Sequence, residues 1–222
     1  KAGLPDGVIT VLTGLGATTG VAATTHDATR KVVFVGSPRT GAIIAGQAAQ
    51  NVVPCVLELG GKSANIVFGD ADLKRAVIGA QAAIFSGAGQ SCVAGSRLLV
   101  QRTVVDRFLD MLVAGANQIP VGDPMDVATQ IGPINNDVQY QTVRRLVASG
   151  QAEGAQLLAG GERPDGDAYQ DGYFLRPTVL GNVRNDMNIA REEIFGPVLS
   201  VIPFDDEAEA VAIANDSKFG LA

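Results

Sequence analysis

The sequence predicts an α/β fold built on parallel sheets. Short runs rich in valine, isoleucine, leucine and phenylalanine alternate with segments whose apolar residues recur at helical spacing. Glycine, proline or serine separates most of these segments, as expected for turns. Strands that alternate with helices usually form parallel sheets with helices packed on their faces.

The first part of the chain contains three expected strands and two expected helices. Residues 7–14 have the composition of a buried strand, and glycines and a helix near 18–25 follow. A β-branched strand over 31–37 leads into a small-residue helix over 38–50, in which Pro38 suits the first helical turn. Residues 53–61 form the next strand, which ends in a glycine pair.

The rest of the chain continues the alternation. A strand over 63–69 precedes a helix over 70–85 that opens with an aspartate suited to the N-cap. A strand over 97–101 and a helix over 103–119 lead into a loop over 120–133 that is rich in proline and glycine. A helix near 136–150 and strands near 155–159, 173–180 and 197–204 complete the pattern.

Composition excludes several classes of function. The 222 residues are 46% hydrophobic and 18% charged with a net charge of -6, and no cluster of lysine and arginine provides a nucleic-acid surface. No apolar run approaches the roughly 20 residues of a membrane span, and the opening residues do not resemble a signal peptide, so a cytoplasmic location is expected. Two cysteines and the single His26, which lies in a polar stretch, provide too few ligands for a metal site or a disulfide framework.

Cys92 is the candidate nucleophile. It lies in GAGQSCVAGSR (87–97), whose small residues leave room around the thiol and supply backbone N–H groups. A free thiol has a pKa of about 8.5 and needs activation, here by those N–H groups and by a base such as Glu58 acting through water. The alternative is a spectator thiol in a flexible loop. Cys55 alternates with apolar residues and is expected in the core.

Glu58 is the candidate general base. It interrupts a strand that otherwise has a buried composition, and burial would raise the pKa of its carboxyl toward a useful range. The alternative is an outward-facing position on a half-exposed strand. Gly60 and Gly61, which follow directly, would allow a sharp turn or a hinge between two domains.

Two glycine turns suggest a nucleotide site. TGLGATTG (13–20) joins a strand to a helix start, an arrangement that directs N–H groups toward a phosphate. Gly14 and Gly16 fit the G-x-G-x-x-G fingerprint, but Thr19 occupies the last glycine position, so an ordinary strand-to-helix turn remains the alternative. Gly36 and Ser37 repeat the geometry after the next strand.

Two acids precede the sequence IFGPV near the C-terminal end. Glu192 and Glu193 fit a solvated helix end, and a carboxylate there also fits a role as acceptor for the hydroxyl groups of a ribose. Composition does not choose between these two interpretations.

LELGGKS, GQSCVAGSR and EEIFGPV, in this order, resemble the signature stretches of the NAD(P)-dependent aldehyde dehydrogenase superfamily. FVGS, GLPDGV, TQIGPIN and YFLRPTVL are similar to further family segments, so the resemblance covers essentially the whole chain. It implies that Cys92 attacks an aldehyde to form a thiohemiacetal and then a thioester. It also implies that Glu58 activates the water that hydrolyses this thioester, and that the Cys92 N–H provides half of an oxyanion hole.

The resemblance implies NAD or NADP as cofactor and seven residues that bind it: Gly16, Gly20, Gly36, Ser37, Leu59, Glu193 and Phe195. The first two would lie by the pyrophosphate and its flanking helix. Gly36 and Ser37 would lie near the nicotinamide. Glu193 would bind the nicotinamide ribose, and Phe195 would pack beside it.

The resemblance also implies parts of two Rossmann-like parallel-sheet domains of the aldehyde dehydrogenase fold. Residues 1–60 would be the C-terminal part of the cofactor-binding domain, and 61–222 the catalytic domain, truncated at its C-terminus. The chain is thus expected to be an internal fragment, inactive by itself, of a parent homodimer or homotetramer that acts on a small-molecule aldehyde. Two alternatives are a coenzyme A-acylating semialdehyde dehydrogenase, which the presence of Glu58 disfavours, and an inactive fragment that keeps only the fold.

Overall fold

A computed structural model describes residues 3–221 and divides the chain into two compact units. The N-terminal unit is Lys1–Gly60 and the C-terminal unit is Gly61–Ala222, so the boundary in sequence falls within the glycine pair. The two units are described separately.

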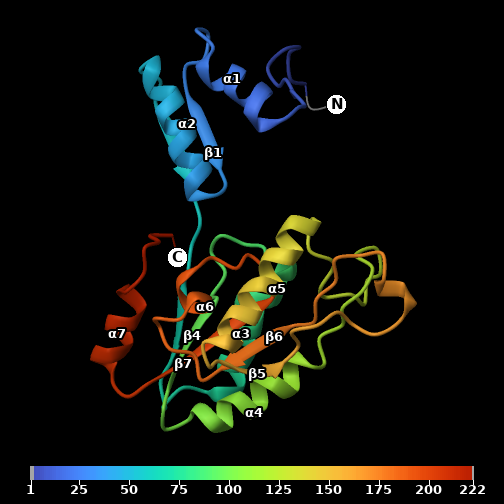
Figure 1. Cartoon of the computed structure of the whole chain (residues 1–222), viewed down its shortest axis with the longest axis vertical. Helices are drawn as coiled ribbons and strands as arrows, with labels where there is room; N and C mark the ends of the chain where they lie inside the picture. Colours follow the sequence, from blue (N-terminus) through green and yellow to red (C-terminus); the bar gives the residue numbers. More distant parts are fainter. Residues whose placement is uncertain (1–2, 222) are drawn as a thin grey trace. The chain divides into compact units, whose positions relative to one another are not determined.

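The N-terminal unit contains a two-stranded parallel sheet with a helix beside it (Figure 1). Its elements are η1 (Gly16–Gly20), α1 (Val21–Thr25), β1 (Val32–Val35), α2 (Pro38–Gln50) and β2 (Cys55–Glu58). Strand β1 pairs with β2 in parallel, with Val35 opposite Glu58. The helices expected near 18–25 and over 38–50 and the strands expected over 31–37 and 53–61 are therefore confirmed.

The strand expected over 7–14 is wrong. These residues form no strand, and Val8, Ile9, Val11 and Leu12 are 60% to 82% exposed. A strand needs a neighbour to accept and donate its backbone hydrogen bonds, and within the described residues β1 pairs with β2 alone. Among residues 3–221 no strand pairs with 7–14, so its apolar composition did not predict a buried strand here.

The C-terminal unit is built on a five-stranded sheet. Its strands are β3 (Ala64–Val67), β4 (Arg97–Gln101), β5 (Gln156–Ala159), β6 (Thr178–Gly181) and β7 (Val198–Phe204), in the order β3-β4-β7-β6-β5. All neighbours are parallel except β5 and β6, which are antiparallel. The α/β class with predominantly parallel sheets is confirmed.

Helices cover both faces of this sheet (Figure 1). On one face lie α3 (Leu73–Phe85) and α4 (Val105–Ala116); on the other lie α5 (Asp137–Ala152), α6 (Asn188–Arg191) and α7 (Glu207–Asn215). Strand β4 shows the alternation directly, since Leu98 and Val100 pack into the first cluster and Leu99 into the second. A three-layer core of this kind fixes the loops at the strand ends, where the candidate site lies.

Two elements begin at a different residue in the structure than the sequence predicts. The N-cap of α3 is Asp72, whose carboxylate accepts from the N–H groups of Lys74 and Arg75, rather than the aspartate at the beginning of 70–85. The strand expected over 173–180 begins only at Thr178, because the preceding Pro177 has no N–H to give to a sheet. No helix within residues 3–221 combines the length and the hydropathy needed to cross a membrane.

Candidate active site

Cys92 lies in the connection between α3 and β4, on a tight turn. The N–H of Ala94 donates to the carbonyl of Ser91 at 3.2 Å and closes this turn around the cysteine. The N–H of Gly95 donates to the carbonyl of Ala83 in α3 at 3.1 Å, which fixes the turn to the helix. The thiol is free and half-buried, so it is held in place yet accessible.

The segment before Cys92 has an unusual backbone. Gly87, Ala88 and Gly89 have φ angles of 58°, 56° and 68°, in the left-handed region that alanine seldom adopts. A side chain at Gly89 would collide with the backbone carbonyl of Gly196. Strained backbone of this kind is concentrated at functional sites, and here it brings the cysteine loop against the loop that follows α6.

Gly61 brings three chain segments together. A side chain at this position would collide with the carbonyl oxygen of Cys92 and lie 2.8 Å from that of Leu221. The Gly61 N–H donates to Oε1 of Glu193 at 3.3 Å. The backbone of Gly61 therefore lies close to the Cys92 carbonyl and also binds the Glu193 carboxylate.

Replacing Gly61 with alanine should damage this site. The added methyl group forces two backbone carbonyls to move, so Gly61→Ala should lower the free energy of unfolding by about 1–3 kcal/mol. A displacement of about 1 Å at the reacting group would lower activity on the order of 10²-fold. Gly79→Ala is the matched control, because its Cβ meets no atom within 4 Å and alanine favours a helix. Equal thermal denaturation curves and equal rates for both variants would contradict this account.

Glu193 is half-buried at the same place, and burial raises the pKa of its carboxyl above the ordinary value. The bond from Gly61 and the positive charge of Lys62 act against this rise. Its neighbour Glu192 is exposed and pairs with Lys218 at 2.8 Å. Glu192 therefore fits the solvated helix end, whereas Glu193 is half-buried and bonded to Gly61.

Phe195 is half-buried and has a φ of 53°, a strained conformation for an aromatic residue. The side-chain amide of Gln139 donates to the carbonyls of Ile194 and Phe195 at 2.7 and 3.0 Å and holds this peptide. Sequence analysis missed Gln139, since a glutamine on an amphipathic helix gives no signal of such a contact.

In the N-terminal unit, four predicted site residues meet at the carboxyl ends of β1 and β2. The N–H of Gly36 donates to the carbonyl of Glu58 at 3.0 Å, and Ser37 caps α2 by accepting from the N–H of Thr40. The Leu59 side chain packs against α2, where a side chain at position 41 would meet it. Gly36, Ser37, Glu58 and Leu59 therefore share one edge of this small sheet.

The burial expected for Glu58 is wrong. Strand β2 is half-exposed, with Cys55 and Leu57 on its half-buried side and Val56 and Glu58 on its exposed side. The apolar run around Glu58 alternates in exposure, so the outward-facing alternative describes it within this unit. Cys55 is half-buried rather than in the core.

The other expected residues of this unit lie around the first helical turn. Gly16 and Gly20 begin and end η1, and a Cβ added at either would meet no atom within 4 Å. His26 caps the C-terminal end of α1 and is exposed, as its polar surroundings indicate. The predicted residues thus fall into two groups: one at the β1–β2 edge and η1, and one around Gly61 that contains Cys92, Glu193 and Phe195.

Two buried cations beside Gly61 escaped sequence analysis. Lys62 is 2% exposed and Arg97 is 1% exposed. The Arg97 guanidinium donates to the carbonyls of Lys62, Ile213 and Ala214 and to the side chain of Asn185, at 2.8 to 3.0 Å. One sequence signal for the burial of Lys62 was available. This lysine directly follows a glycine pair at the start of a strand, a position where an exposed lysine is not expected.

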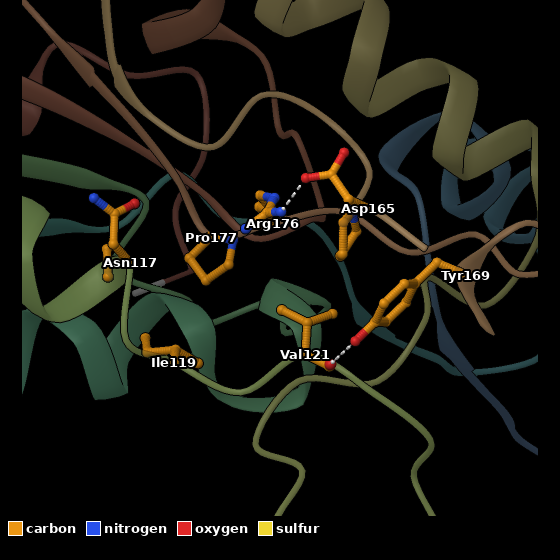
Figure 2. Close-up of a pocket in the computed structure, with 9 residues that line it drawn as sticks. Asn117, Ile119, Val121, Asp165, Tyr169, Arg176 and Pro177 are labelled. Atoms are coloured by element: carbon orange, nitrogen blue, oxygen red, sulfur yellow. Dashed lines mark hydrogen bonds and ion pairs between the residues drawn. The ribbon is translucent and has the colours of Figure 1, made fainter. Parts of the chain in front are cut away.

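A separate hollow of about 160 Å³ contains none of the predicted residues (Figure 2). Its polar groups bind one another: Arg176 pairs with Asp165 at 3.0 Å, and the Tyr169 hydroxyl donates to the carbonyl of Val121 at 3.0 Å. These contacts stabilise the loops that line it. Within residues 3–221, no three histidine, cysteine or acidic side chains are grouped to bind a metal ion.

The family model described as "Aldehyde dehydrogenase family" matches residues 1–222, the complete sequence. The chain belongs to the aldehyde dehydrogenase family. Betaine aldehyde dehydrogenase of Brucella anthropi is 46% identical over all 222 residues, which are 45% of that protein. The chain thus spans less than half the length of the curated relatives it matches.

Solved aldehyde dehydrogenase structures have the same fold. Betaine aldehyde dehydrogenase from Staphylococcus aureus, in complex with NAD+, is 40% identical and superposes with a TM-score of 0.90 over 93% of this chain and 41% of that one. An aldehyde dehydrogenase variant from Bacillus cereus is 42% identical, with a TM-score of 0.89 and the same coverage. The resemblance of the signature stretches to this family is confirmed.

Proposed function

We propose that the full-length protein carrying this chain oxidises an aldehyde to a carboxylic acid with NAD(P)+, using Cys92 as nucleophile and Glu58 as general base. The observation that carries the proposal is that the Cys92 carbonyl and the Glu193 carboxylate both lie against the backbone of Gly61. Membership of the aldehyde dehydrogenase family supports it.

Cys92 has the features that a nucleophile needs. Its turn is anchored to α3 through Gly95, so the thiol does not have to be ordered before attack. The attack forms a carbon–sulfur bond, and the carbonyl oxygen gains the negative charge. The N–H of Cys92 has no acceptor within the described residues and is free to stabilise that charge. Loss of hydride from the thiohemiacetal carbon then leaves a thioester on Cys92.

Glu58 is proposed to remove a proton from the water that attacks this thioester. The water oxygen bonds to the acyl carbon, the carbon–sulfur bond breaks, and the Cys92 thiol is restored with the carboxylic acid as product. An exposed carboxylate at the end of β2 is accessible to water, as this step requires.

The residues present fit a nicotinamide dinucleotide, which when bound supplies the hydride acceptor. Glu193 uses one carboxylate oxygen for the Gly61 N–H, so the other oxygen is left to accept from a ribose hydroxyl. Gly16 and Gly20 leave open space at η1, and Ser37 begins the 13-residue α2, whose N-terminus favours a negatively charged group. The N-terminal unit is accordingly proposed as part of the cofactor-binding domain and the C-terminal unit as part of the catalytic domain.

The decisive experiment follows nicotinamide absorbance while the full-length protein is mixed with NAD+ or NADP+ and a panel of aldehydes. Betaine aldehyde heads the panel because several relatives carry that name. Reduced nicotinamide and free acid should appear together in equal amounts. Acyl-coenzyme A formed when coenzyme A is added, in place of the free acid, would instead identify a coenzyme A-acylating semialdehyde dehydrogenase. No reduction with any aldehyde would refute the proposal. A homodimeric or homotetrameric parent protein remains a prediction from the resemblance, and a cytoplasmic location remains a prediction from the sequence.

A further inference from the structure

Lys62 is a buried lysine without a hydrogen-bond partner. It is 2% exposed, and its Nζ bonds to no group within the described residues. An unpaired ammonium group is costly to bury, so its retention calls for a specific interaction. Within the described residues no hydrogen bond uses this ammonium, because Arg97 donates from its Nε to the backbone carbonyl of Lys62 and not to its side chain.

The surroundings of Lys62 show which group it acts on. The preceding residue, Gly61, donates its N–H to the Glu193 carboxylate. Lys62 is therefore the next residue in the chain after the group that binds Glu193. Burial has the largest effect on the pKa of Lys62, which Arg97 also lowers and which Glu193 and Glu192 raise. Arg97 donates to three backbone carbonyls and to the side-chain oxygen of Asn185, and Glu192 is paired with Lys218. Glu193 is the acid of this group that lacks a salt bridge.

We propose that Lys62 is a positioning residue of the cofactor site, which keeps Glu193 ionised and directed at the nicotinamide ribose. This inference rests on the proposed function, because it assigns Glu193 the task of accepting hydrogen bonds from the ribose. A protonated Glu193 would lose one of its two acceptor oxygens, and the Gly61 N–H and a ribose hydroxyl would then compete for the other. The half-buried setting of Glu193 favours protonation, and the neighbouring cation opposes it.

The proton balance of the pair gives the expected pH dependence. Burial, followed by the charge of Arg97, lowers the pKa of Lys62 from 10.5 to about 7, so Lys62 is protonated in the acidic range where Glu193 titrates. Removing that positive charge raises the pKa of the Glu193 carboxyl further. NAD+ binding should therefore weaken at a higher pH in a variant without the charge than in the wild type.

The experiment measures NAD+ binding by titration calorimetry from pH 5 to 9 in the full-length protein and in Lys62→Met, which keeps the volume of the side chain. In Lys62→Met we expect the loss of NAD+ affinity at acidic pH to begin about one pH unit higher than in the wild type. At the acidic end of the pH range this shift is about a tenfold loss of affinity. In steady state KM for NAD+ should rise while kcat changes less than about threefold. Lys74→Met, on the exposed side of α3, is the matched control and should behave as wild type.

A second variant separates coupling from general damage. In a Glu193→Gln background the lysine has no carboxylate to act on, so Lys62→Met should change NAD+ affinity by less than about twofold there. If Lys62→Met does not fold, as judged by circular dichroism, Lys62→Gln removes the same charge and replaces it in the cycle. An unmoved acidic limb, or an equal loss in the Glu193→Gln background, would overturn the inference. Absence of NAD+ binding to the wild type would instead refute the proposed function.

Stability gives a readout that needs no cofactor. Folding lowers the pKa of Lys62, so the unfolded chain binds more protons than the folded one between pH 7 and 10.5. The wild type should therefore gain stability relative to Lys62→Met as pH rises through this interval. A difference in denaturation midpoint that does not change with pH would show that Lys62 is not the buried cation required here.

Discussion

Cys92→Ala should abolish aldehyde oxidation in the full-length protein. Removal of a catalytic nucleophile typically lowers turnover by about 10⁴–10⁶-fold, because the remaining groups stabilise a transition state that no longer forms. NAD+ affinity should change little, since Cys92 does not belong to the residues proposed to hold the cofactor. The measurement is reduced nicotinamide per unit time together with titration calorimetry.

Cys55→Ala is the matched control for this variant. Both cysteines are free and half-buried, so the two variants compare cysteines at different positions with similar exposure. The control should keep nearly full activity, and iodoacetamide followed by peptide mapping should label Cys92 faster than Cys55. Activity of Cys92→Ala within tenfold of the wild type would eliminate Cys92 as the nucleophile.

Glu58→Gln should slow hydrolysis of the thioester far more than its formation. Loss of a general base costs about 10²–10⁴-fold in the step that it serves, and the amide keeps the shape of the side chain. Stopped-flow mixing with NAD+ and aldehyde should give a first burst of reduced nicotinamide close to one per active site, followed by very slow turnover. Mass spectrometry should find the acyl group on Cys92.

Asp27→Asn removes an exposed acid of the same unit and should leave both phases unchanged. Loss of the burst together with turnover in Glu58→Gln would place Glu58 in the first half of the reaction. A burst and a steady rate equal to those of the wild type would remove Glu58 from the mechanism.

Sequence patterns predicted well where local physics decides the outcome. Helix α2 begins at Pro38 after a serine cap, and β4 occupies 97–101, because capping groups and a short apolar run between turns are local signals. The expected strand over 7–14 did not form, since a strand depends on a partner that its own residues do not encode. The burial expected for Glu58 was wrong for a related reason: an apolar composition does not reveal that β2 has one open face.

The candidate site was predicted as a set of residues and not as an arrangement. Cys92 and Glu193 were identified separately, while their common anchor Gly61 was interpreted as a turn or a hinge. Their approach depends on contacts of the Gly61 backbone with the Cys92 carbonyl, 92 − 61 = 31 positions away, and with the Glu193 carboxylate, 132 positions away, and such contacts leave no trace in a single sequence. Lys62 and Arg97 were missed because burial of a charged residue is decided by the assembled core.

The guanidinium of Arg97 has a mechanical consequence. It donates to a carbonyl at the start of β3 and to two carbonyls at the end of α7, and these acceptors lie about 150 positions apart in the chain. Moving α7 away would break several hydrogen bonds of the buried Arg97 guanidinium at the same time. Small displacements of that helix are therefore resisted, and a large displacement breaks these bonds together. The position of the last helix of this unit is therefore coupled through Arg97 to the peptide next to Gly61.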